Sequence, residues 1–216
     1  MKKVFAILLV LSCLTAGLLC SCAGGGSGGN ITKANLTKLV MENGRLIPGE
    51  GLEWGMSAED FLAGQYGSEV LDPESEKFEQ HRVGAMPNGW TSYDPPVTVS
   101  LKDYGVTAEP DCTFDADGKL NAVVYTVTLP EDDSDQFAEV LNAMCKEADS
   151  AENLRLTLGE PKTFSADDAA GIKLILQWAD DTDGTYFEIN ALNFASSLII
   201  AVRVSTVDLR ADDAFE

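Results

Sequence analysis

The chain has 216 residues, of which 45% are hydrophobic, so it is long and apolar enough for one domain or two small ones with a packed core. It contains 35 acidic residues against 15 basic ones, which gives a net charge of −20. Such a charge opposes binding to nucleic acid and to anionic lipid headgroups, and it suits solubility, cationic partners or loosely held divalent ions. A solvated acidic surface is the simplest explanation of the charge.

The first residues are typical of a bacterial export signal. Lys2 and Lys3 precede an apolar run that extends from Val4 to Leu19. A basic start followed by a short apolar region is the pattern of a signal peptide. A run of roughly 16 residues is marginal for crossing a bilayer, so the residues that follow decide between a cleaved signal and an anchor.

The end of this run resembles the lipobox of bacterial lipoproteins. Leu19 stands three residues before Cys22, and the small Ser21 directly precedes it. In that family the cysteine thiol receives a diacylglyceryl group, and the signal is removed just before it. Cys13 would leave too short an apolar region, and Cys20 follows a bulky residue. The resemblance therefore implies lipidation at Cys22, with fatty acyl chains such as palmitate held in the bilayer.

This interpretation divides the N-terminal region into two parts. Residues 1–21 are the signal peptide, and residues 22–30 are the lipid anchor with a Gly/Ser linker. Residues 23–29 contain only alanine, glycine and serine, so they predict a flexible tether with a span of roughly 15 Å. Such a tether resembles those of Gram-positive lipoproteins. The resemblance implies an extracytoplasmic protein attached to the cell membrane.

The region after the tether predicts one helix before a polar stretch. Residues 31–50 fit either a short helix or a strand. Ser57 is a natural N-cap and two acidic residues follow it, so a helix is expected from there to about Gln65. Residues 72–96 are polar and rich in proline, which predicts a long loop.

That loop contains the candidate partner-binding residues His81, Trp90 and Tyr93. Aromatic side chains on a polar loop are typical of protein-binding surfaces. The alternative is that the two aromatic residues belong to the core or hold the loop in place. His81 is the only histidine, and a solvated or structural histidine is the simpler interpretation because no nucleophile is paired with it.

Strands and one strong helix follow. Alternating apolar residues predict a strand at 97–101, and 115–119 reads as a hairpin turn before a strand at 122–129. Apolar residues at helical spacing predict a helix over 134–148. A short helix is expected within 149–158, and three strands at 172–179, 185–192 and 197–205.

Two segments resemble small bacterial α/β lipoprotein modules. These are the Trp-Gly-Met-Ser opening at residues 54–57 and the Phe-Asp-x-Asp-Gly-Lys-Leu pattern at 114–120. The modules are the SmpA/OmlA type of assembly lipoprotein and the β-lactamase inhibitor proteins. The resemblance implies an α/β module that binds another protein.

The order of elements predicts an α+β fold of tandem helix-plus-antiparallel-sheet repeats, with the helices packed on one face of the sheet. The first half is expected at 31–129 and the second at 130–216, forming two sheets or one continuous sheet. Two unrelated halves in a single domain are the alternative.

The residue types argue against several chemistries. One histidine and two unlipidated cysteines do not make a zinc site. Asp115 and Asp181 begin short acidic turns, but neither is followed by the glutamate that completes a calcium loop. Cys112 and Cys145 both fall on apolar faces, so they form either a disulfide, which export permits, or two buried free thiols.

We therefore expect no cofactor and no enzymatic activity. The leading hypothesis is a protein-binding or scaffolding lipoprotein of the cell envelope, which uses its sheet face or the 72–96 loop. The alternative is a cell-surface receptor for a small ligand or cation. A hydrolase that uses carboxylates alone is a third hypothesis, since 35 acidic residues always form pairs.

Overall fold

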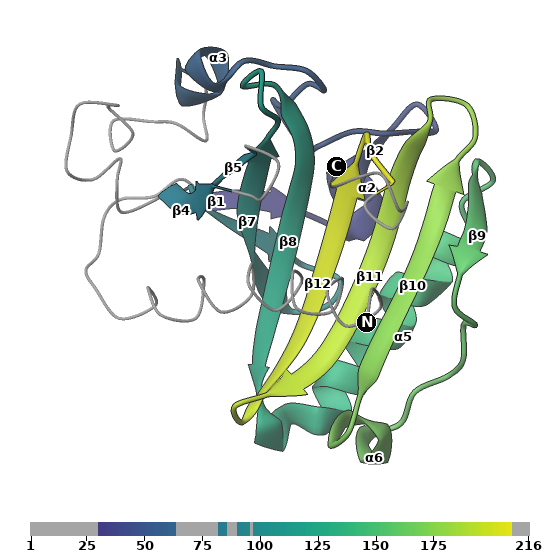
Figure 1. Cartoon of the computed structure of the whole chain (residues 1–216). Coiled ribbons are helices and arrows are strands. Elements are labelled where there is room, and N and C mark those ends of the chain that lie inside the picture. Colours follow the sequence, from purple (N-terminus) through teal and green to yellow (C-terminus); the bar gives the residue numbers. More distant parts are fainter. Residues whose placement is uncertain (1–29, 64–81, 86–89, 96, 209–216) are drawn as a thin grey trace, which may run out of the picture.

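The computed structural model describes residues 30–63, 82–85, 90–95 and 97–208 (Figure 1). Cys22, the tether and His81 lie outside these residues, so lipidation and the role of His81 stay predictions.

A ten-stranded mixed sheet dominates the described part of the chain (Figure 1). Its main path runs β1-β6-β7-β8-β12-β11-β10-β9, with β5 beside β7 and β4 beside β5. β1 is parallel to β6, and the other neighbours are antiparallel. The strands are β1 (Asn30–Lys33), β4 (Arg82–Ala85), β5 (Thr91–Tyr93), β6 (Thr98–Leu101), β7 (Val106–Phe114), β8 (Leu120–Pro130), β9 (Leu154–Leu158), β10 (Lys173–Asp180), β11 (Thr185–Phe194) and β12 (Ser197–Ser205).

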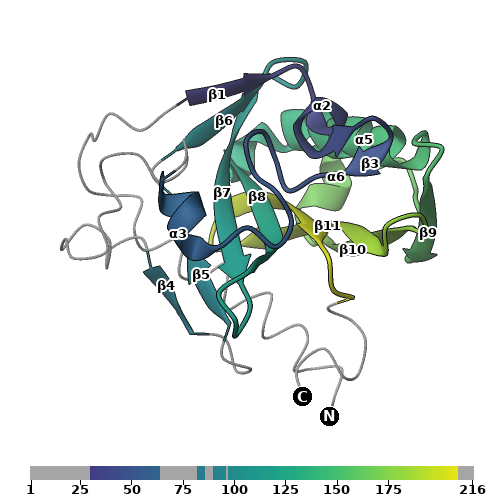
Figure 2. The same ribbon diagram turned by 90° about the horizontal axis from the view of Figure 1, so that it is seen from above.

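The helices are few, and three of them lie on one side of the sheet. Figure 2 shows the sheet curving around α2, α5 and α6. The helices are α2 (Leu36–Val40), α3 (Ala58–Ala63), α5 (Ser134–Asp149) and α6 (Ala166–Ala169), with a 3₁₀ turn at Glu131–Asp133. A separate hairpin pairs β2 (Met41–Glu42) with β3 (Arg45–Leu46).

The predicted helix over 134–148 is confirmed as α5. Its apolar stripe of Phe137, Leu141 and Met144 is 0–1% exposed and packs into the core. The sheet contributes Trp178 and Phe187, whose rings lie 5.6 Å apart between centroids. An amphipathic helix of this length gains its stability from burying that stripe.

The predicted tandem repeat is wrong. The described part of α3 has six residues, whereas α5 has sixteen. β8 spans the expected boundary at 129/130 and pairs with β12, so of the two expected forms the structure has the single continuous sheet. The parallel pair of β1 and β6 has no counterpart after residue 130 among the described strands. Similar element order along the chain says nothing about which strands become neighbours, and here the neighbours differ between the halves.

Two further local results complete the comparison. The short helix expected within 149–158 is wrong, because Leu154–Leu158 forms the edge strand β9 and pairs with β10. A short apolar run fits the spacing of a helix as well as that of a strand. Here the free edge of β10 favours the strand, because β9 pairs with it. The three strands expected at 172–179, 185–192 and 197–205 are confirmed as β10, β11 and β12.

The N-terminal segment contains both structures that the sequence left open. Asn35 caps α2 by accepting a hydrogen bond from the backbone N–H of Lys38. The turn between β2 and β3 is Asn43-Gly44, and both residues have positive φ, 51° and 76°. This backbone twist suits a tight hairpin, and Asn-Gly is the pair that adopts it most easily. The hairpin places residues 47–56 across from α2.

Candidate functional site

A cavity of about 550 Å³ opens between α2, the β2–β3 hairpin and the segment that follows it. Its apolar lining is Leu39, Met41, Ile47, Leu52, Trp54 and Met56. Leu39 and Leu52 are buried, and the other four are half-buried. Cavities of about 300–1,000 Å³ with apolar walls are typical of sites for small organic ligands. We call this site the Trp54 cavity.

Charged side chains surround this apolar lining. They are Lys33, Lys38, Glu42, Glu50 and Glu53. All except the half-buried Lys33 are exposed, which places their charges toward the solvent end of the site. Lys33 and Glu50 form an ion pair of 2.8 Å between Nζ and Oε2. The cavity therefore combines an apolar interior with charges of both signs at its mouth.

Hydrogen bonds from outside the cavity hold its walls in place. The buried Tyr125 of β8 donates its hydroxyl to the carbonyl of Pro48, at 2.7 Å. The indole N–H of Trp54 donates to the carbonyl of Leu46, at 3.0 Å. The backbone N–H of Ile47 donates to the carbonyl of Val40, at 2.8 Å. These bonds hold the indole and the turn before it in place. A ligand would therefore lose little binding free energy to ordering these groups.

The segment carrying Trp54 is also tied to the β7–β8 hairpin. The N–H of Gly55 donates to the carbonyl of Leu120, and the N–H of Leu120 donates to the carbonyl of Met56, both at 2.9 Å. Gly55 has a φ of +76°, which a glycine adopts without strain. The Trp-Gly-Met sequence is therefore explained by a turn that joins the site to the sheet.

α2 is anchored at its first turn. The hydroxyl of Tyr104 accepts a hydrogen bond from the N–H of Leu36, at 3.1 Å. Burial, above all, raises the pKa of Tyr104 well above its usual value. A carboxylate oxygen of Glu147 on α5 accepts from the N–H of Thr37, at 3.3 Å. The helix that forms one wall of the cavity thus has two of its free N–H groups satisfied by the body of the fold.

The candidate residues from the 72–96 region do not form an exposed surface in the described part of the chain. Trp90 is only 8% exposed. Tyr93 is half-buried, and its ring meets that of Phe114 edge to face at 5.4 Å. The alternative that these aromatic residues serve packing fits both observations. His81 lies outside the described residues.

The two cysteines expected in the interior are both buried and both free. Burial raises the pKa of Cys145 to about 12, and it raises that of Cys112 well above the usual value. A thiol with a raised pKa is a poor nucleophile. Of the two alternatives for this pair, the structure contains the one without a disulfide.

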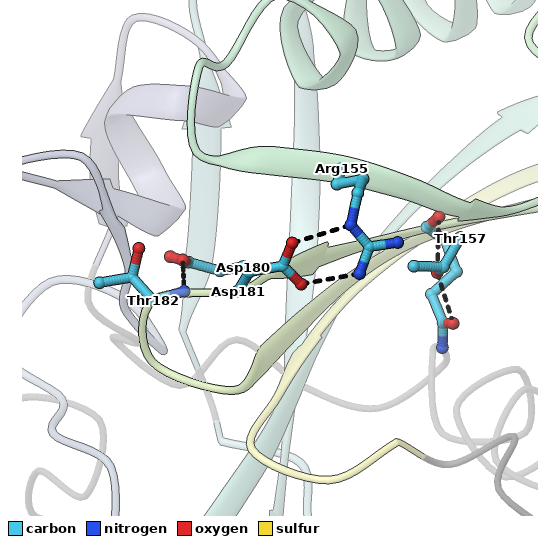
Figure 3. Close-up of polar contacts among 6 residues, drawn as sticks. Arg155, Thr157, Asp180, Asp181 and Thr182 are labelled. Carbon is cyan, nitrogen blue, oxygen red and sulfur yellow. Dashed lines mark hydrogen bonds and ion pairs between the residues drawn. The ribbon is translucent and has the colours of Figure 1, made fainter.

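The acidic turn between β10 and β11 is held by hydrogen bonds and ion pairs (Figure 3). Asp180 accepts from the N–H of Thr182 at 2.9 Å, which closes the turn. Asp181 receives both arms of the Arg155 guanidinium, at 2.7 and 2.8 Å, and this contact lowers the pKa of the carboxyl. Within the described part of the chain, no group of three or more candidate metal ligands occurs.

A row of polar residues crosses the sheet on the face away from α5. Gln177, Glu188 and Arg203 stand opposite one another on β10, β11 and β12. The row continues through Val124 of β8 to Asp111 of β7. Strands lie about 4.8 Å apart, so Asp111 and Glu188, three strands apart, are separated by about 14 Å. That separation exceeds the reach of a pair of catalytic carboxylates.

The ionisable members of this row have polar partners. Glu188, which is 3% exposed, lies 3.5 Å from a guanidinium nitrogen of Arg203 and accepts a hydrogen bond from the Asn190 amide. Ser92 donates to Asp111 at 2.9 Å. Burial nevertheless raises the pKa of Asp111 to about 7. These contacts neutralise much of the buried charge, and they explain the row as part of the structure.

A comparison with protein-family models, curated proteins and solved structures finds no match to this chain. No helix in the described ranges has the length and apolar character needed to span a membrane.

Sequence reasoning missed the Trp54 cavity. Residues 31–50 gave two incompatible interpretations, and the site needs both a helix and a hairpin there. One signal was available: Trp54, Met56 and Leu52 cluster beside the glutamates of the Pro-Gly turn. The order of residues in the sequence does not show that Lys33 and Lys38 line the same cavity as these apolar residues.

Proposed function

We propose that this chain is a lipid-anchored extracytoplasmic binding protein, which holds a small ligand in the Trp54 cavity and acts by binding rather than catalysis. The observation that supports it best is the cavity: about 550 Å³, with an apolar interior, a charged mouth and walls held by hydrogen bonds. The lipobox at Cys22 supports the anchor.

The anchor has a direct test. We expect the wild-type chain to lose residues 1–21 and to incorporate labelled palmitate, and a Cys22→Ser variant to incorporate none and to keep its signal peptide. A chain that loses residues 1–21 and incorporates no palmitate would refute the lipid anchor.

The binding role is tested with a thermal-shift screen of metabolites and metal ions on the purified chain. A hit that binds in the cavity should lose most of its stabilisation in a Trp54→Ala variant, because the indole lines the site. Leu158→Ala is the control, since Leu158 is 40% exposed on β9 and does not line the cavity. A hit that is equally strong in both variants would place the site elsewhere.

Binding to a partner protein is a second candidate, and the edge strand β9 favours it. β9 pairs with β10 on one side, and no described strand pairs with its other side. Leu158 on this strand is an exposed large hydrophobic residue. Such an edge can accept an extended segment of another protein. If it does, a Leu158→Lys variant should lose a partner that wild type and Trp54→Ala both capture from envelope extracts.

A further inference from the structure

The charges at the mouth of the Trp54 cavity restrict the chemistry of its ligand. Lys33 is already paired with Glu50. Lys38, Glu42 and Glu53 also line the site, are exposed, and form no ion pair with another described residue. One positive and two negative groups are thus available to a ligand that rests on the apolar interior.

Ligands with a single charge fit this arrangement less well. A simple anion would meet two carboxylates and a protein with a net charge of −20. A simple cation would gain the carboxylates but would leave Lys38 beside its apolar body. A ligand with an ammonium and a carboxylate satisfies both signs, and charge-assisted hydrogen bonds are the stronger kind.

We propose that the Trp54 cavity binds a zwitterion with an apolar body, namely an apolar amino acid or a very short apolar peptide with both ends free. The apolar side chains of the ligand lie against Trp54, Leu52 and Met56. Its carboxylate faces Lys38, and its ammonium faces Glu42 and Glu53. This inference rests on the proposed binding role of the cavity and adds the class of ligand.

The test measures binding of one dipeptide in three forms to the full lipoprotein in detergent micelles. Isothermal titration calorimetry compares free dileucine, its N-acetylated form and its C-terminal amide. Each blocked form should bind at least about tenfold more weakly, because each loses one charge-assisted contact. Equal affinity of the free and blocked forms would overturn the proposal, as would no measurable binding of the free form.

Variants assign the two ends of the ligand. Lys38→Met should weaken the free dipeptide by about tenfold and leave its amide unchanged. Glu53→Gln should weaken the free dipeptide and leave the N-acetylated form unchanged. Lys173→Met and Glu152→Gln are matched controls, because both residues are exposed and neither lines the cavity. Weaker binding by the two control variants would contradict the assignment. So would unchanged binding by Lys38→Met and Glu53→Gln.

The two proposals fail in different ways. If dileucine does not bind but another compound stabilises wild type and not Trp54→Ala, the zwitterion is refuted and the receptor stands. If the screen gives no Trp54-dependent hit of any kind, both are refuted.

Discussion

Replacing Tyr125 with phenylalanine tests whether the cavity wall is held from the sheet. Tyr125 is 1% exposed, and its hydroxyl donates to the buried carbonyl of Pro48 at 2.7 Å. Phenylalanine keeps the ring and its packing and removes only the donor. The lost hydrogen bond costs about 1 kcal/mol, and leaving the carbonyl unsatisfied adds about 1 kcal/mol more. We therefore expect a loss of about 2 kcal/mol in the free energy of unfolding.

Urea denaturation followed by circular dichroism measures this loss, and the slope with denaturant should not change. The melting temperature should fall by about 4–8 °C. Tyr186→Phe is the control, because Tyr186 is half-buried and its hydroxyl forms no hydrogen bond with another described residue; it should change stability by less than about 0.5 kcal/mol. A loss below about 0.5 kcal/mol for Tyr125→Phe would refute the idea that this bond holds the wall.

Three other predictions concern strain, protons and thiols. Gly159→Ala should destabilise by more than about 1 kcal/mol in the same assay, because Gly159 has a φ of +85° and an added Cβ would lie 2.6 Å from the carbonyl oxygen of Ile175; a neutral result would contradict that geometry. Burial raises the pKa of Asp111 to about 7. Between about pH 4 and 7 this carboxyl is therefore protonated in the folded state and ionised in the unfolded state. Stability should fall as the pH rises through that range, and Asp111→Asn should flatten the fall in urea titrations at several pH values; identical slopes would argue against a raised pKa. Without reductant, a denatured chain whose Cys13, Cys20 and Cys22 are replaced by serine should show two reactive thiols, and the same chain in its native state should show none over the same minutes, because Cys112 and Cys145 are free and buried; zero thiols after denaturation would indicate a disulfide.

Local patterns predicted the elements that depend on near neighbours in the chain. The stripe of Phe137, Leu141 and Met144 identified α5 because helical spacing is visible in the sequence itself. Asp115 accepts from the N–H groups of Asp117 and Lys119, so the turn before β8 is also stabilised locally. Both results come from contacts between residues at most a few positions apart.

The candidate site could not be predicted in the same way. Lys33 and Trp54 bond to Glu50 and Leu46 within residues 33–56, and these contacts depend on how that stretch folds back on itself. Tyr125, which bonds to Pro48, comes from the distant strand β8. Residues 31–50 look ambiguous because α2 and the β2–β3 hairpin occupy only five and two-plus-two residues. Elements this short gain their stability from tertiary contacts, such as those of Tyr104 and Glu147 with α2.

The sequence by itself determined the positions of α5 and of strands β10, β11 and β12, because these signals are carried by residues close together in the chain. The export signal with lipidation at Cys22 is a prediction of the same local kind. Only the tertiary structure decided that β8 lies beside β12, which gives one sheet instead of two, and that the strand neighbours differ between the two halves. It also decided that β9 is a strand and that a cavity forms over Trp54. The physical reason is that strand pairing joins residues far apart in the chain. The cavity lining lies within residues 33–56, but distant residues such as Tyr104 and Tyr125 hold its short elements in place, and local propensity does not show those contacts.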